Sequence, residues 1–565
     1  MHHYAAFWVV LALVIFGLAY RFYARFLATR IFDCDDDDTP TPAVTMEDGI
    51  DYVPTGKHVV LGHHFTSIAG AAPIVGPAAA CVYGWLPAVF WIVIGVVVIG
   101  AMHDFAALVM SVRHGGKSVG DVAGELMGER PRTLFLCLIV ILTWLVLAAF
   151  ASIIAKLFVA HPASVIPINI EIPIAILIGW WTYKKSGSLL LPSLVALVIM
   201  WGGVFVTATN PALQLAFPEA GLLGFTPVQL WVGLLLSYSF ITCMLPVWML
   251  LQPRDFINSH QLFVGLAAIF LAIFIANPEL TAPAINASVP GGTGPIFPML
   301  FVTIACGAVS GFHALVASGT TSKQIKSLRH ARPIGYGSML GEGCLAIAAT
   351  MAVAAGFTAS EWELHYTPGH ALNRGALGNF VQGTSNLLQG AFSGLHGDVA
   401  KTIVAVIVIS FAATTLDTAC RIQRYCLGEL GAAWGIKALC NRYVASAVAA
   451  FTPLALVLET GDGKELWLSI WPVFGSSNQM LGALTLLVVT IWLKKQGKPI
   501  WYTGLPAVFL TCVTFTGLTA LIHGELTKDT TRLAVLIPAV VLLLLALAII
   551  VEGVNVLRRP RPSGA

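Results

Sequence analysis

Two polar residues that could carry protons lie next to each other inside an otherwise apolar stretch. His103 and Asp104 stand in the run 85–112, about 13 Å from its inner end if the run is helical. An ionisable side chain inside a membrane is costly to bury and usually faces a cavity. A histidine beside an aspartate could titrate near neutral pH, which would suit a proton relay. A pair that only fixes helix packing is the structural alternative.

A second polar group lies in the segment 411–425, which reads FAATTLDTACRIQRY. At helical spacing Thr414, Asp417 and Arg421 share one face, and Thr415 lies beside it. With backbone carbonyls from a neighbouring helix, these hydroxyls and the carboxylate could form a small coupling site for a cation or a proton. Two alternatives stay open: Asp417 could pair with Arg421 one turn on, and the threonines could bond to their own helix.

The stretch that could supply such carbonyls is 62–80, GHHFTSIAGAAPIVGPAAA. It is apolar enough to enter a membrane, but Pro73 and Pro77 each remove an N–H from the helical ladder, which would leave the carbonyls of Ala69 and Pro73 unpaired. Broken backbone at membrane depth survives where it is buried in protein or lines a cavity. We therefore expect a binding site here. Its candidate substrate residues are Ser67, Gly70, Ala71, Pro73 and Gly76, and Ala69 is a candidate ligand of the coupling site.

A second stretch of small residues, FVTIACGAVSGFHALVASG, begins at Phe301 within the expected span 297–320. Two interrupted helices that run in opposite directions in corresponding halves of a chain are typical of a transporter site. Tight helix packing through small residues is the alternative, but the antiparallel pair favours the site. The candidate substrate residues here are Gly307, Ser310, Gly311 and His313.

The composition requires a membrane to hold these elements. The chain has 565 residues, of which 57% are hydrophobic and only 10% charged, and its mean hydropathy is +0.83. These values predict an all-α polytopic membrane protein with about 15 transmembrane helices. We place spans at about 5–27, 64–83, 85–112, 132–158, 170–183, 188–208, 228–250, 260–276, 297–320, 336–357, 400–420, 442–459, 466–493, 502–522 and 533–556.

The loops between these spans indicate the orientation. Most of the 31 Lys and Arg residues fall in alternate loops, including Arg254, and cytoplasmic loops are enriched in both residue types. The N-terminus is therefore expected outside and the C-terminus in the cytoplasm. On the inner side the acidic run 33–38 is read as a solvated linker, with a cation site as the alternative. On the outer side the loop 358–399 is long enough to pack as a lid.

Several kinds of chemistry have no sequence support. The ten cysteines form no C-x-x-C pair, so neither a zinc site nor a disulfide framework is expected. No H-E-x-x-H and no G-x-x-x-x-G-K-[ST] motif is present. We expect no enzymatic activity, no metal and no cofactor; the energy for any transport would come from an ion gradient.

Six strings carry a resemblance to a known family: GHHFTSIAGAAPIVGP, IGAMHDF, LQPRDFIN, FPMLFVTIACGAVSGFHALVASGTTSKQ, TTLDTACRIQRY and WPVFGSSNQML. Over nearly its whole length the chain resembles the carbon starvation protein A family. That resemblance implies the LeuT-like fold of five-plus-five inverted repeats with discontinuous helices at a midplane site. It also implies that Thr414 and Thr415 match the hydroxyls of the eighth core helix that help to hold sodium in sodium-coupled relatives.

The resemblance implies a division of the chain. The transporter core would be 64–495, with inserted helices at 170–276 and the long outer loop 358–399. An extra span and the acidic linker would occupy 1–63, and two further spans would occupy 496–565.

It also implies a function. We expect an ion-coupled importer of a small carboxylate, pyruvate in the first instance, in a bacterial inner membrane, with protons as the coupling ion and sodium as the alternative. Membrane lipid would surround it, and no nucleic acid would bind. Uptake of di- or tripeptides is the alternative substrate, and a sensor that binds without translocating is a further alternative. From a different class, a haem-binding oxidoreductase could use His63, His64, His103 and His313 as axial ligands.

Overall fold

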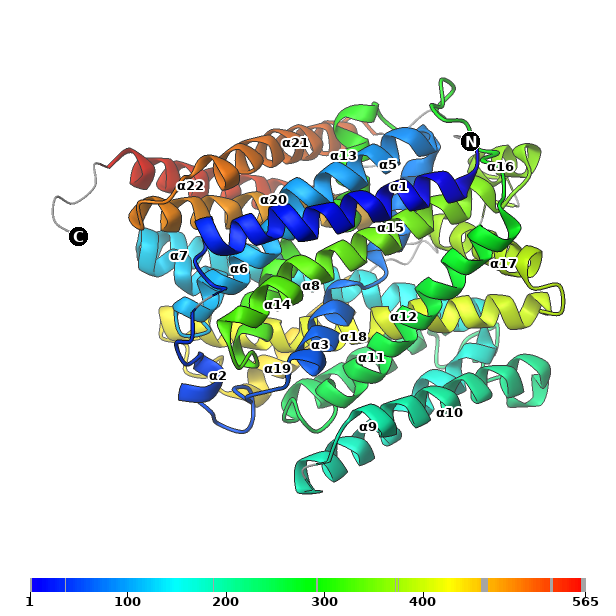
Figure 1. Ribbon diagram of the computed structural model, residues 1–565, viewed down its shortest axis with the longest axis horizontal. Helices are drawn as coiled ribbons and strands as arrows, with labels where there is room; N and C mark the ends of the chain where they lie inside the picture. Colours follow the sequence, from blue (N-terminus) through cyan, green and yellow to red (C-terminus); the bar gives the residue numbers. More distant parts are fainter. Residues whose placement is uncertain are drawn as a thin grey trace.

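The computed structural model describes residues 3–35, 37–185, 187–290, 293–370, 372–373, 375–458, 466–528 and 532–559. Within these ranges the chain is helical, and its few β-bridges are isolated. The long helices lie side by side along the longest axis of the molecule (Figure 1). The first helix begins at one end of this bundle and the last helix ends at the other.

Thirteen helices in the described ranges are long and apolar enough to cross a membrane, and a bent helix pair adds a fourteenth. A shorter apolar helix, Arg442–Leu458, lies among them. This is a polytopic all-α membrane protein. The spanning helices are α1 (Ala5–Leu18, continued to Ile31), α5 (Trp85–Ile94) with α6 (Ala101–Arg113), α8 (Glu129–Ala160), α9 (Val165–Lys185), α10 (Leu190–Thr209), α11 (Pro227–Met244), α12 (Leu251–Ala276), α13 (Ile296–Ala308) with α14 (Gly311–Gly319), α15 (Ser338–Ala355), α18 (Gly397–Trp434), α20 (Leu466–Lys495), α21 (Trp501–Leu526) and α22 (Leu533–Arg558). The bent pair is α3 (Lys57–Ile68) with α4 (Ala72–Ala80), and the shorter helix is α19.

One tight turn sets the position of the bent pair against the next helix. Gly84 joins the end of the pair to α5 with φ +102, and a Cβ at this position would lie 2.7 Å from the Cα of Ile285. Only glycine combines this backbone conformation with so close an approach. The chain therefore reverses direction at once after α4.

The α12 helix differs from the sequence prediction. Its expected span was 260–276, with Arg254 in a cytoplasmic loop, but the helix begins at Leu251 and the polar residues of LQPRDFINS are buried in it. The prediction failed because hydropathy scores these residues as a loop, whereas in the protein they face other polar side chains. Arg254 is therefore part of the membrane-buried core and is not an orienting loop charge.

The loop 358–399 contains two helices, α16 (Ala359–Tyr366) and α17 (Gly375–Ala391). They lie at the end of the molecule where α1 begins (Figure 1). The α17 helix packs on α4, α12, α15 and α18, and the hydroxyl of Tyr366 donates to the carbonyl of Ala78 over 2.5 Å. This segment therefore covers the end of the bent pair that it faces.

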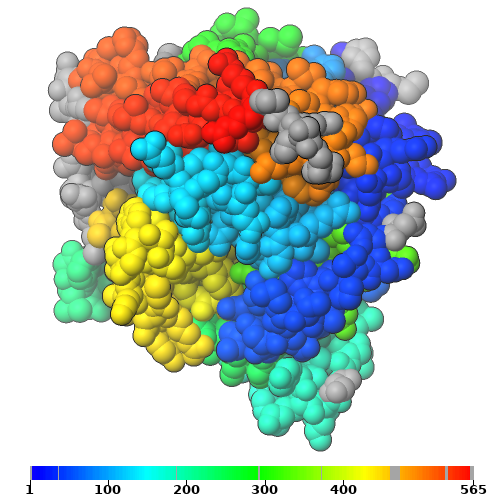
Figure 2. Space-filling view, turned by 90° about the vertical axis from the view of Figure 1, so that its left-hand side faces the viewer, coloured from blue at the N-terminus to red at the C-terminus, as the bar shows by residue number. Residues whose placement is uncertain are grey.

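At the opposite end the segment before α3 crosses the surface beside α7 (Val119–Met127), where it is drawn in dark blue in Figure 2. The acidic run in it is not simply solvated, as was predicted, because four of its carboxylates meet cations from three other connections. Asp36 of this run lies outside the described residues. The pairs are Asp33–Lys498 (2.5 Å), Asp35–Arg332 (2.7 Å), Asp37–Arg113 (3.2 Å) and Asp38–Arg329 (2.6 Å).

Candidate functional site

The first helix break lies at Ala69–Ala71, where α3 and α4 meet at 43°. It precedes both prolines. Pro73 stands in the first turn of α4, where its missing N–H costs nothing, and Pro77 is accommodated inside α4. The expectation that the prolines mark the break was therefore right to within one helical turn for Pro73 and wrong for Pro77, which does not interrupt the helix. No side chain caps the N-terminus of α4.

The second break lies at Val309 and Ser310, which are extended between α13 and α14. Asn478 of α20 fills this break: its Oδ1 accepts from the N–H of Phe312 over 2.8 Å, and its Nδ2 donates to Ser310 Oγ over 3.0 Å. Sequence reasoning gave Asn478 no role. The available signal was a buried amide inside the apolar run 466–493.

The two broken helices touch each other close to their breaks. A Cβ on Gly76 would lie 2.5 Å from the carbonyl oxygen of Thr303, and one on Gly307 would lie 3.1 Å from Pro77. Within the first break, a Cβ on Gly70 would lie 2.6 Å from Thr415 Oγ1. These glycines permit the backbones to meet. All the predicted substrate residues of both breaks are buried.

The hydroxyls of α18 reach the first break through Ser67. Thr415 donates to the carbonyl of Ser67 over 3.1 Å, and Thr418 Oγ1 lies 3.1 Å from Ser67 Oγ. Thr414 accepts from Asn258 of α12 over 2.9 Å. The carbonyl in contact with Thr415 is that of Ser67 and not that of Ala69. The coupling site at these residues stays a prediction. Asn258 was missed because it stands in the stretch read as a loop.

Asp417 has a different neighbourhood from these hydroxyls. It forms a buried ion pair with Arg254, and it accepts hydrogen bonds from Tyr238 (3.1 Å), Ser239 (3.3 Å) and Thr242 (3.2 Å). Its carboxylate is therefore turned toward α11 and α12, whereas Thr415 and Thr418 contact α3. The alternative pairing of Asp417 with Arg421 is wrong, because Arg421 contacts Asp51, 3.2 Å away.

A row of buried titratable side chains lies beside the breaks, on the α3 side of the first and on the α14 side of the second. His64 Nε2 of α3 lies 3.0 Å from Asp104 Oδ2 of α6. The same carboxyl oxygen is 4.0 Å from His313 Nδ1 of α14, and His313 Nε2 is 3.0 Å from Glu342 Oε2 of α15. All four side chains are almost completely buried. The structure thus brings predicted Asp104 and His313 together with His64 and Glu342, on four helices.

A second set of contacts flanks this row. His63 is paired with Asp255 of α12, and its Nε2 lies 3.1 Å from Thr320 Oγ1. His64 Nδ1 lies 2.8 Å from Thr321 Oγ1. Both histidines of α3 therefore contact the end of α14.

His103 is also buried, and its Nε2 has no hydrogen-bond partner among the described residues. It is not part of the row that joins Asp104 to Glu342. Three of the four histidines considered as haem ligands, His63, His64 and His313, each lie within ion-pair distance of a carboxylate. In the described part of the chain no group of three or more His, Cys, Asp or Glu side chains is arranged to hold a metal ion.

Just before α3, Asp51 contacts the far end of α18. Its Oδ1 lies 3.2 Å from both Arg421 and Arg424 and accepts from Tyr425 over 2.6 Å. Burial alone would raise the pKa of Asp51, but Arg424 and Arg421 outweigh it and hold the pKa below its ordinary value. This contact joins the N-terminal side of the first broken helix to α18.

Comparison with known proteins gives one consistent family. A family model described as "Carbon starvation protein CstA" matches residues 4–361 and 363–517. A protein of Campylobacter jejuni named peptide transporter CstA is 33% identical, over 91% of this chain and 80% of its own length. The pyruvate/proton symporter BtsT of Escherichia coli is 31% identical, over 91% of this chain and 81% of its own.

A solved structure supports the fold. The manganese transporter of Eremococcus coleocola superposes with a TM-score of 0.51 at 13% identity, covering 91% of this chain and 98% of its own. That likeness concerns the fold alone. The predicted LeuT-like architecture, with an antiparallel pair of broken helices at its centre, is confirmed.

Proposed function

Since the chain belongs to the carbon starvation protein CstA family, whose curated members are membrane transporters, we propose that it imports a small carboxylate, pyruvate in the first instance, together with protons. The substrate leaves the site chemically unchanged, and neither a cofactor nor an enzymatic step is involved. We place it in a bacterial inner membrane, and the distribution of basic loops supports an N-terminus outside and a C-terminus in the cytoplasm.

The observation that carries proton coupling is the row His64–Asp104–His313–Glu342. Each member stands on a different helix, and two of those helices are the inner halves of the broken pair. Uptake or loss of a proton changes the charge within this row, and an uncompensated charge in so buried a place is costly. Protonation would therefore change how α3 and α14 pack on α6 and α15, which couples a proton to movement around the site.

The site supports an anionic substrate of small size. The N-terminus of α4 points into the first break without a side-chain cap. Pro73 has no N–H and the N–H of Ile74 donates to the carbonyl of Ala71, so the start of α4 offers a carboxylate the N–H of Ala72 and a partial positive charge. At the second break the N–H of Phe312 is not free to bind a carboxylate, because it already donates to Asn478. The close approach of Gly70 to Phe150 and Thr415 leaves little room beside the first break. A three-carbon acid suits these dimensions better than a peptide, and the named pyruvate/proton symporter is a relative.

Peptide uptake is the second candidate, because several relatives at 31–34% identity are named peptide transporters. A peptide presents the same carboxylate to α4. It would require the broken helices to separate further than they do here.

Sodium is the alternative coupling ion. Ser67, Thr414, Thr415 and Thr418 place hydroxyl and carbonyl oxygens beside the first break, and oxygen ligands suit hard cations. These oxygens already have hydrogen-bond partners within the protein. The titratable row, in contrast, can bind and release protons, and this favours protons as the coupling ion.

The test is uptake of labelled pyruvate by the purified protein in liposomes under an imposed pH gradient. We expect accumulation above the external concentration that collapses with a protonophore and resists excess di- and tripeptide. A separate arm replaces the pH gradient with a sodium gradient. Accumulation driven by sodium alone would overturn proton coupling. Gradient-driven uptake of peptide without pyruvate would overturn the substrate.

A further inference from the structure

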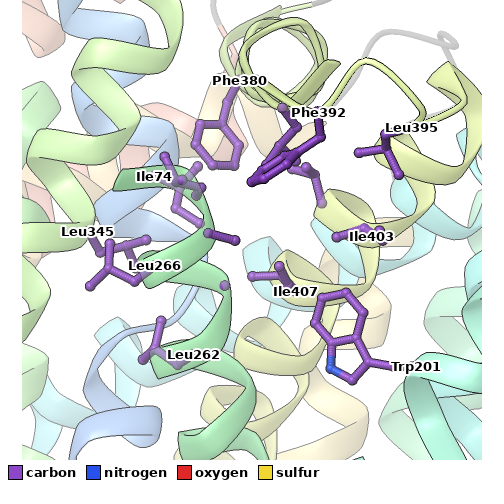
Figure 3. Close-up of a pocket in the computed structure, with 15 residues that line it drawn as sticks. Ile74, Trp201, Leu262, Leu266, Leu345, Phe380, Phe392, Leu395, Ile403 and Ile407 are labelled. Carbon is purple, nitrogen blue, oxygen red and sulfur yellow. The ribbon is translucent and has the colours of Figure 1, made fainter. Parts of the chain in front are cut away.

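An apolar cavity lies between α10 and the core helices α12 and α18, next to the start of α4. Its volume is about 180 Å³, and Figure 3 shows side chains from several helices pointing into it. The lining residues come from α4 (Ile74), α10 (Trp201), α12 (Leu262, Gly265, Leu266, Ala268, Ile269), α15 (Leu345), α17 with the turn after it (Phe380, Leu388, Phe392, Leu395) and α18 (Ile403, Val404, Ile407).

The lining excludes polar ligands. Among its side chains the indole nitrogen of Trp201 is the one polar atom. A carboxylate, an amine or an amide placed here would lose its partners in water without gaining new ones, which is strongly unfavourable. Neither pyruvate nor a peptide therefore fits, and the cavity is distinct from the transport site. Cavities of similar lining and about 150 Å³ stay dry and bind small hydrocarbons.

The position of the cavity identifies the hydrocarbon. Ile407 lies ten residues, or about 15 Å, along α18 from the end nearer α17, and Trp201 lies about 12 Å from the same end of α10. Both depths fall within one leaflet of a hydrocarbon core about 30 Å thick. Lipid chains are the hydrocarbon available at that depth.

The cavity also adjoins the lipid-facing surface. Trp201, Leu266, Ala268 and Ile403 are only half-buried, and they form its rim. Next to them, Val198 and Val264 on the outer faces of α10 and α12 are exposed, as expected of residues that contact acyl chains. The way in from the bilayer is therefore short and wholly apolar.

We propose that this cavity holds a segment of one acyl chain of a membrane phospholipid, which enters past Trp201 and Ala268. The acyl chain would occupy space that the side chains leave open and that is too apolar for water. It contacts Ile74, which stands two residues into α4, and Phe380 of α17, so it packs directly against the outer half of the first broken helix and the segment that covers it. The proposal rests on the cavity and is independent of the transported substrate.

The test uses Trp201 as the probe. The protein is reconstituted in phosphatidylcholine brominated along one chain, and quenching of Trp201 is taken as the difference between wild-type protein and Trp201→Phe. Ala268→Phe should fill the cavity and reduce that quenching by at least about twofold, because a packed interior leaves no room for the chain. Ile403→Phe fills it from α18 and serves if Ala268→Phe does not fold.

Val264→Phe is the matched control, because it adds the same side chain to the exposed face of α12. It should leave the quenching of Trp201 unchanged. Equal quenching in the filled variants and in wild-type protein would show that bromine reaches Trp201 only from the surrounding bilayer, and would overturn the proposal. A further arm uses a brominated free fatty acid in unbrominated lipid; quenching in that arm without quenching by brominated phospholipid would also overturn it.

Discussion

Arg254 of α12 and Asp417 of α18 form an ion pair in which each side chain is only 2% exposed. Asp417 also accepts three hydrogen bonds from α11, so its carboxylate is fully satisfied. The pair joins three helices at membrane depth. This arrangement favours a structural role for Asp417, which the sequence had placed among the candidates for ion coupling.

Asp417→Asn should therefore destabilise the protein before it affects coupling. Removing one partner of a buried pair leaves the other charge uncompensated and costs about 3–5 kcal/mol. We expect a lower melting temperature in detergent and a parallel loss of uptake and exchange. A double variant, Arg254→Met with Asp417→Leu, should recover much of the stability. A selective loss of gradient-driven accumulation in a stable Asp417→Asn protein would instead support the coupling role.

Glu342→Gln should separate accumulation from exchange. The variant keeps the shape of the side chain beside His313 but cannot release a proton. If the buried row carries the coupling proton, accumulation under a pH gradient should fall by at least about tenfold, while exchange of labelled for unlabelled pyruvate continues. Glu361→Gln, on the exposed start of α16, is the control. Equal loss of both activities in a folded protein would argue against a relay.

Thr415→Val should distinguish the two coupling ions. The variant loses the hydrogen bond to the carbonyl of Ser67, a change of about 1 kcal/mol in stability. Proton-driven uptake should persist, because the titratable row is untouched. Abolished uptake together with lost sodium stimulation would move the assignment to a sodium site at Ser67.

Gly76→Val should block transport by forcing the broken helices apart. Its Cβ would meet the carbonyl oxygen of Thr303 at 2.5 Å, and backbone cannot yield as a flexible side chain can. Overpacking of this kind costs about 1–3 kcal/mol. Gly202→Val is the matched control, since nothing lies within 4 Å of its Cβ. Uptake in Gly76→Val at the wild-type rate would mean that this contact is not maintained during transport.

Asp51→Asn should weaken the contact between the segment before α3 and α18, and so make α3 more accessible from the face that carries the acidic run. Because the pKa of Asp51 is held below its ordinary value of 3.8, its ion pairs contribute fully above that value and are lost as the pH falls through the lower, folded-state pKa. The contacts with Arg421 and Arg424 should therefore be unchanged between pH 5 and pH 8. Labelling of a cysteine placed in α3 should be faster in Asp51→Asn than in wild-type protein at neutral pH, and the wild-type rate should not vary over that range.

The backbone of the site could be predicted because its signals are local. Proline within an apolar run and a Gly-Ser-Gly cluster at mid-span each weaken a helix wherever they stand, and both breaks fall within a turn of the expected places. The side of α18 that bears Thr415 follows from helical periodicity in the same way.

The partners of the polar side chains could not be predicted. Asp417 pairs with a residue 163 positions away, and Asn478 reaches Phe312 across 166, so no periodicity within one helix reveals either contact. The stretch around Arg254 misled hydropathy for a related reason. Its polar residues are buried because others, far along the chain, satisfy them.

The four ion pairs of the acidic run bear on how cargo departs. Arg113, Arg329, Arg332 and Lys498 come from three separate connections, and left alone they would form a positive rim at this face. An anion escaping from such a rim would be held back, because attraction between exposed charges extends over a Debye length of about 8 Å at physiological ionic strength. Each of these cations is already matched by a carboxylate. If the proposed acid anion is released at this face, as the proposed orientation requires, it would therefore leave without being held back, and the empty carrier could turn over again.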